Sequence, residues 1–165
     1  MLIDTHVHLD EFQNKEVSDI LDRAFDVGVG FVISAGTTIE TSYRSIELSN
    51  IFDRFFSGVG VHPMDIKTRL IEEDFQVITK LANENDKVVV MSEIGLDYLD
   101  GMPDREWQFA AFRSQIGIAR ELSLPIVFHS REAHFDSLRV LREERAFDVG
   151  GIMHYFQGST EDAKH

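Results

Sequence analysis

Two histidines one residue apart are the first feature of this chain that could do chemistry. His6 and His8 stand in the N-terminal run of residues 4–10, and alternate side chains of an extended strand share one face. Both imidazoles can therefore reach the same ion, so the pair could form half of a metal site. Taken alone, the two residues could equally be solvated side chains at a polar strand end.

Four further ligand-type side chains each follow an apolar run of strand length. They are His62 after residues 55–61, Glu93 after 88–92, His129 after 125–128 and His154 after 150–153. Such short runs without polar alternation are typical of parallel strands that are buried on both faces. Parallel strands end at one edge of their sheet. We therefore expect these side chains to gather there with the N-terminal pair.

Amphipathic stretches with helical spacing separate the apolar runs, among them residues 104–122 and 132–144. The order is strand then helix, five times, followed by a sixth strand, which predicts an α/β fold with parallel crossovers. A complete (β/α)8 TIM barrel needs eight strands and about 250 residues. We therefore expect about six strands and five helices of such a barrel, as one C-terminally incomplete domain over residues 1–165. The rival is an open doubly wound sheet, although no glycine-rich phosphate loop follows the first strand.

Five motifs occur in a characteristic order along the chain. They are DTHVHLD at 4–10, GVHP at 60–63, SEIGLDY at 92–98, PIVFHSR at 125–131 and GIMHYF at 151–156. In sequence and order they resemble the TatD-type metal-dependent deoxyribonucleases of the amidohydrolase superfamily. The resemblance implies a barrel hydrolase with a two-metal site, a DNase that cleaves phosphodiester bonds, often from a DNA end.

The resemblance also implies a set of metal ligands. His6 and His8 would hold the first divalent ion, His129 and His154 the second, and Glu93 would bridge the two. Imidazole and carboxylate suit Zn, Mn or Mg, and a carboxylate between two ions offsets their repulsion. A water held by such a pair loses a proton near neutral pH and becomes the nucleophile.

Four more residues are candidates for contact with substrate. His62 would donate a hydrogen bond to the substrate phosphate, and Arg131 could clamp the same phosphate through its planar fork. Asp97 and Tyr98 could shape the access of substrate or support Glu93, and a structural role is equally open. Glu93 could instead cap a loop or pair with Arg131, and His62-Pro63 could be a plain turn.

One family position is not reached by this sequence. The family completes its first metal position with an aspartate after the last strand, which we expect beyond residue 165, and activity is in doubt if the chain ends there. A second function class is an amidohydrolase that acts on an amide, ester or lactone of a small molecule. Many such relatives bridge their metals with a carbamylated lysine, and Glu93 holds that place here. A non-enzymatic metal-binding module or assembly fragment is a third.

Composition sets limits on partners and compartment. With 29 acidic and 16 basic residues the formal charge is −13, and no basic stripe for gripping long DNA is visible. Binding at a DNA strand end or of a small phosphoester fits better. The chain has no cysteine, which excludes a disulfide-linked partner and permits a reducing compartment. Neither a signal peptide nor a membrane span is apparent, so we expect a cytoplasmic protein.

Overall fold

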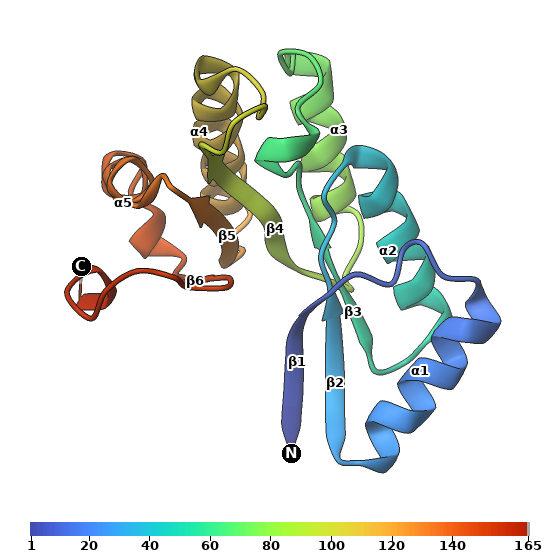
Figure 1. Ribbon diagram of the computed structural model, residues 1–165. Helices are drawn as coiled ribbons and strands as arrows, with labels where there is room; N and C mark the ends of the chain where they lie inside the picture. The colour runs from blue at the N-terminus through green and yellow to red at the C-terminus, as the bar shows by residue number, and fades with distance from the viewer. Residues whose placement is uncertain (165) are drawn as a thin grey trace.

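Six parallel strands form one sheet in the computed structural model, which describes residues 1–164. The strands are β1 Leu2–Val7, β2 Val29–Ser34, β3 Phe55–Val59, β4 Val88–Asp97, β5 Ile126–Arg131 and β6 Gly151–Met153. They lie in chain order, each hydrogen-bonded in parallel to the next. The sheet curls as part of a barrel, and the expected α/β barrel architecture is confirmed (Figure 1).

An α-helix follows each of the first five strands along the chain. The helices are α1 Asn14–Asp26, α2 Ile39–Ile51, α3 Glu72–Asn83, α4 Arg105–Glu121 and α5 His134–Glu143, with 3-10 turns η1 Pro63–Asp65, η2 Ala146–Asp148 and η3 Asp162–Lys164. The expected helix at 104–122 begins after Asp104, whose carboxylate accepts hydrogen bonds from the amides of Glu106 and Trp107. Within residues 1–164 no helix has the length and apolarity to cross a membrane.

The main core fills the space between the sheet and helices α3, α4 and α5. Its fully buried members include Met91 and Ile94 of β4, Phe112 and Ile116 of α4, and Ile126 of β5. Phe112 packs near Phe128 of β5, with ring centroids 6.5 Å apart. This core anchors β4 and β5, the two strands that carry Glu93 and His129.

Helix α2 packs on the sheet through serines. Ser42, Ser45 and Ser49 are all buried. The Ser45 hydroxyl donates to the main-chain oxygen of Ser34 at 3.2 Å, and the Ser42 hydroxyl accepts from the main-chain amide of Gly60 at 3.2 Å. The small side chains and direct hydrogen bonds bring the helix close to the backbone of β2 and of the segment after β3.

Candidate metal centre

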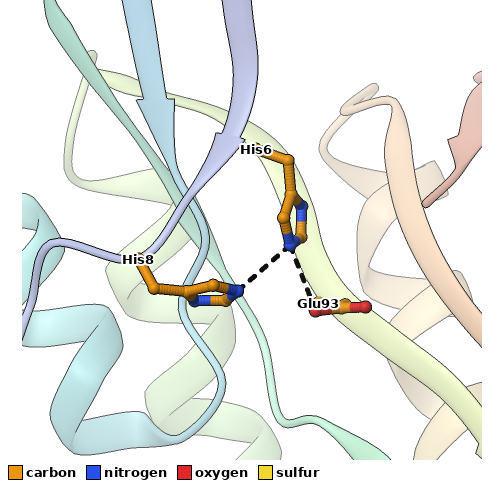
Figure 2. Close-up of side chains that lie close together, drawn as sticks. All are labelled: His6, His8 and Glu93. Atoms are coloured by element: carbon orange, nitrogen blue, oxygen red, sulfur yellow. Dashed lines mark hydrogen bonds and ion pairs between the residues drawn. The ribbon is translucent and has the colours of Figure 1, made fainter. Parts of the chain in front are cut away.

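Glu93 lies at the centre of the candidate site. It belongs to β4 and its side chain is buried. One carboxylate oxygen, Oε2, lies 3.2 Å from Nε2 of His6, and this nitrogen lies 3.2 Å from Nε2 of His8. Figure 2 shows the two histidines, at and just after the end of β1, pointing toward the carboxylate. The structure therefore brings together side chains from β1, from the residue just after it and from β4.

These separations are those of ligands to a shared ion. Two donors held about 2.1 Å from one ion lie about 3.0–3.4 Å apart at octahedral to tetrahedral angles. Donor atoms of His6, His8 and Glu93 form one group with the chemistry to hold a metal ion. The three residues fit the first ion that the family resemblance implies.

The other Glu93 oxygen faces a second pair of histidines. Oε1 lies 3.3 Å from Nδ1 of His129 and 3.7 Å from Nε2 of His62, and these three residues form a second group able to hold a metal. Oε1 is buried and has no hydrogen-bond partner among residues 1–164. A buried carboxylate oxygen without a partner is costly. A cation held between Oε1 and Nδ1 of His129 would satisfy it, so these two residues fit part of the ligand set of a second ion.

Glycine at position 95 permits the approach of β5 to this carboxylate. Gly95 lies opposite His129 in the β4–β5 register and has a φ of +147°. A Cβ at this position would lie 2.0 Å from the main-chain oxygen of His129. A larger residue at position 95 would therefore push His129 away from Glu93.

Asp97 orients the imidazole of His129. Its carboxylate is fully buried, and Oδ2 lies 2.9 Å from Nε2 of His129 while Oδ1 accepts from the main-chain amide of Leu99 at 3.0 Å. An ionised carboxylate only accepts hydrogen bonds, so Nε2 of His129 carries the proton. Nδ1 then faces Oε1 of Glu93, where a bound ion would take the place of a second ring proton. Asp97 thus supports a candidate ligand from behind, the arrangement that fixes metal-binding histidines in many sites.

His62 is held as a neutral hydrogen-bond donor. Its Nδ1 accepts from the main-chain amide of Met64 at 3.1 Å, so the proton resides on Nε2, the nitrogen that faces Glu93. Burial lowers the pKa of His62 to about 4, although the negative charge of Glu93 acts to raise it. The sequence raised a plain turn as the alternative. A turn is present at η1, and His62 both caps it and points its imidazole into the site.

The charges of the site support one another. Burial by itself would raise the pKa of Glu93, but the contacts with His129 and His6 hold it well below its usual range. Burial likewise opposes the charged form of His129, yet Glu93 and Asp97 raise its pKa above the ordinary value. The cluster therefore keeps an ionised carboxylate at its centre and favours positive charge beside it.

His154 lies next to the first group. Its ring stacks on that of His6, with centroids 3.7 Å apart and planes 18° from parallel. Its main-chain amide donates to the main-chain oxygen of Phe128. Burial and, to a lesser extent, the neighbouring His6 lower the pKa of the His154 imidazole. Among the described residues, the group around His129 contains His62 rather than His154. A ligand role for His154 at the second ion stays a prediction.

The predicted substrate contacts occupy the same end of the strands. Arg131 is exposed at the last position of β5, and the ion-pair contacts of Glu93 are made with histidines instead of Arg131. The Tyr98 hydroxyl donates to Asp136 at 2.7 Å and the Arg105 guanidinium lies over its ring, 3.9 Å from the centroid. Tyr98 therefore joins the β4–α4 loop to α5, and its role toward substrate is untested.

Two buried glutamines, Gln108 and Gln115, hold backbone segments beside the site and were not among the predicted site residues. The available signal was their seven-residue spacing, which places both on the apolar face of α4 with Phe112. A polar side chain on a buried helix face needs a partner. Periodicity alone did not say which partner that is.

Known proteins share both the sequence and the fold of this chain. The family model for TatD-related DNase matches residues 3–165. A Bacillus subtilis (strain 168) protein described as the uncharacterized metal-dependent hydrolase YabD is 38% identical over 99% of this chain and 64% of its own length. The 3'-5' ssDNA/RNA exonuclease TatD of Salmonella typhimurium is 34% identical over 89% of this chain and 56% of its own length.

Solved structures agree with these relatives. The crystal structure of YjjV, a TatD homologue from Escherichia coli K12, superposes with a TM-score of 0.89 at 29% identity, covering 99% of this chain and 63% of that one. An Entamoeba histolytica TatD-family hydrolase has the same fold, with a TM-score of 0.87 at 24% identity. The chain thus spans less than two thirds of the length of these relatives. The family match over nearly all of its residues establishes that the chain belongs to the TatD-related DNase family.

Proposed function

We propose that the protein is a divalent-metal-dependent hydrolase that cleaves phosphodiester bonds of DNA. One observation carries the proposal: the two oxygens of the buried Glu93 carboxylate face different groups of histidines. A bridging carboxylate between two ions requires this arrangement. The descriptions of the relatives as metal-dependent hydrolases and, in one case, as an exonuclease support it.

Each residue of the site has a distinct role in this proposal. Two Mg, Mn or Zn ions would be held by His6 and His8 on one side and by His129, with the predicted His154, on the other. Glu93 would lie between them. When bound, such ions polarise a phosphoryl oxygen and lower the pKa of water.

The groups nearest the substrate would bind and orient the phosphate. Nε2 of His62, which carries the ring proton, would donate a hydrogen bond to a phosphate oxygen. Because His62 is buried, little water competes for this bond. Arg131, exposed at the end of β5, would pair with a second phosphate oxygen. Asp97 holds the His129 imidazole with Nδ1 directed at Glu93.

Charge argues for a substrate bound locally. The formal charge of −13 repels a long polyanion, and neutralising a few phosphates near two divalent ions requires no extended basic surface. We therefore propose that a DNA strand end, rather than the interior of a duplex, enters the site.

A nuclease assay with a matched pair of variants tests the function. Full-length protein is expected to degrade 3'-labelled single-stranded DNA with Mn²⁺ and to lose this activity in chelator. Glu93→Ala should abolish both hydrolysis and high-affinity Mn²⁺ binding, with an unchanged far-UV circular dichroism spectrum. Glu84→Ala, an exposed carboxylate at the end of α3, serves as the control and should retain both.

Two results would redirect the assignment. Activity in chelator, or in Glu93→Ala, would mean that the chemistry takes place elsewhere. Metal-dependent cleavage of an ester, amide or lactone without cleavage of DNA would place the protein among the small-molecule amidohydrolases.

A further inference from the structure

Helix α4 reaches the site through its two buried glutamines. Gln108 and Gln115 are fully buried and lie seven residues apart, so they share one face of the helix. Each side-chain amide pairs with both the backbone N–H and the backbone C=O of a single residue. The two residues held in this way are Val61 and Asp97.

Val61 immediately precedes His62. The Oε1 atom of Gln115 accepts from the Val61 amide at 2.7 Å and its Nε2 donates to the Val61 oxygen at 3.2 Å. The pairing of β3 with β4 ends at Val59, so Val61 lies beyond the last strand pair. Gln115 thus takes the place of a neighbouring strand for the residue next to His62.

Asp97 is held in the same manner at the end of β4. The Oε1 atom of Gln108 accepts from the Asp97 amide at 2.8 Å, and its Nε2 donates to the Asp97 oxygen at 2.9 Å and to the Pro103 oxygen at 2.8 Å. On its other side Asp97 lies opposite Arg131 of β5. Since Asp97 directs the ring of His129, Gln108 acts on that histidine through one intermediate residue.

The chemistry of the primary amide explains why glutamine serves at both positions. A buried backbone N–H and C=O left without partners are costly. Only an amide side chain offers one acceptor and one donor group side by side without charge. A methionine of similar length would leave both backbone groups unpaired, and a glutamate would lose the donor.

We propose that Gln108 and Gln115 are positioning residues, which hold the backbone of Asp97 and of Val61 so that His129 and His62 keep their places against Glu93. The inference rests on the proposed function, because a role in positioning is meaningful only if this cluster is the active site. It assigns different consequences to the two glutamines. Gln108 acts on a candidate metal ligand, whereas Gln115 acts on a candidate substrate donor.

Methionine substitutions with two readouts test the proposal in full-length protein. The imidazole ¹⁵N signals are recorded in metal-free protein, and Mn²⁺ binding is measured by calorimetry. Gln108→Met is expected to shift the His129 signals and to weaken Mn²⁺ binding about tenfold, the lower end of what is typical for residues behind a ligand. Gln115→Met should shift the His62 signals and change Mn²⁺ affinity less than about twofold. The control Ile116→Val removes one buried methyl group from the same helix and should change neither readout.

Specific outcomes would overturn the inference. Wild-type ring signals in both glutamine variants would refute it, as would an equal loss of Mn²⁺ affinity in Ile116→Val. If a methionine variant does not fold, the glutamate variant at that position, which keeps the acceptor for the backbone amide, replaces it with the same expected direction. A wild-type protein that binds no Mn²⁺ would refute the proposed function, while the ring signals would still decide the positioning.

Discussion

Replacing Asp97 with asparagine should remove the ring proton from Nε2 of His129. The native carboxylate accepts from His129 Nε2 at 2.9 Å and from the Leu99 amide at 3.0 Å. An asparagine that keeps the bond from Leu99 must present its NH₂ group to His129. Two donors cannot face each other, so Nε2 loses its proton and the remaining ring proton stays on Nδ1, the nitrogen 3.3 Å from Glu93 Oε1.

A proton fixed on Nδ1 removes one metal donor without removing a residue. With Nδ1 protonated, His129 has no lone pair for an ion beside Glu93. Changes behind a metal ligand typically cost 10–100-fold in affinity, which equals about 1.4–2.7 kcal/mol. The opposite orientation of the new amide would leave the Leu99 amide without an acceptor, so it does not restore the native arrangement at Asp97.

Calorimetric titration of Mn²⁺ into Asp97→Asn measures the affinity, and ¹⁵N spectra of the imidazoles report the tautomer. Asp136→Asn is a suitable control because Asp136 also accepts a hydrogen bond, from Tyr98, and contacts none of the metal-site histidines within the described residues. It should bind Mn²⁺ as the wild type does. An Asp97→Asn protein with wild-type affinity and an unchanged His129 tautomer would refute the reasoning.

Three further changes have defined outcomes. Arg131→Ala should raise KM for single-stranded DNA about tenfold and leave Mn²⁺ affinity unaltered, since one charge-assisted hydrogen bond is lost; an unchanged KM would exclude phosphate contact. Phe112→Ala should lower the free energy of unfolding in urea by about 3–5 kcal/mol, because Phe112 is fully buried. The folded-state pKa of His62 is about 4, so unfolded protein takes up its proton first as the pH falls below about 6.5. Metal-free wild type should therefore lose up to about 2 kcal/mol more than His62→Gln between pH 7 and 5, and parallel profiles would contradict this.

The strand order and direction were predictable because buried parallel strands leave a strong signal, whereas the ends were not: β4 and β5 continue past Glu93 and His129 to Asp97 and Arg131. The apolar residues before Glu93 and His129 are largely buried in the structure, as uninterrupted runs indicate. A ligand-type residue directly after such a run lies in the C-terminal half of its strand or beyond it, where side chains of parallel strands converge. This reasoning needs only the order and direction of the strands, and both came from the sequence.

The partners of each side chain were not predictable from the pattern. Whether His62 or His154 turns toward Glu93 and His129 depends on the backbone after the strand, here the η1 turn at His62. Asp97 was a candidate for substrate binding, and its burial against His129 follows from the local path of β4. Side-chain direction at strand ends is set by tertiary hydrogen bonds, which hydrophobic periodicity does not record.

The serine contacts of α2 limit how far that helix can move. A helix on a purely apolar face can shift slightly at small cost because dispersion contacts have no preferred direction. Hydrogen bonds from Ser45 to Ser34 and between Ser42 and Gly60 are directional and define both the height and the rotation of α2. The oxygen of Thr37, just before the helix, accepts from the amide of His62 at 2.8 Å. The position of His62 therefore depends on α2 as well as on the sheet, so a shift of this helix would also displace the His62 imidazole.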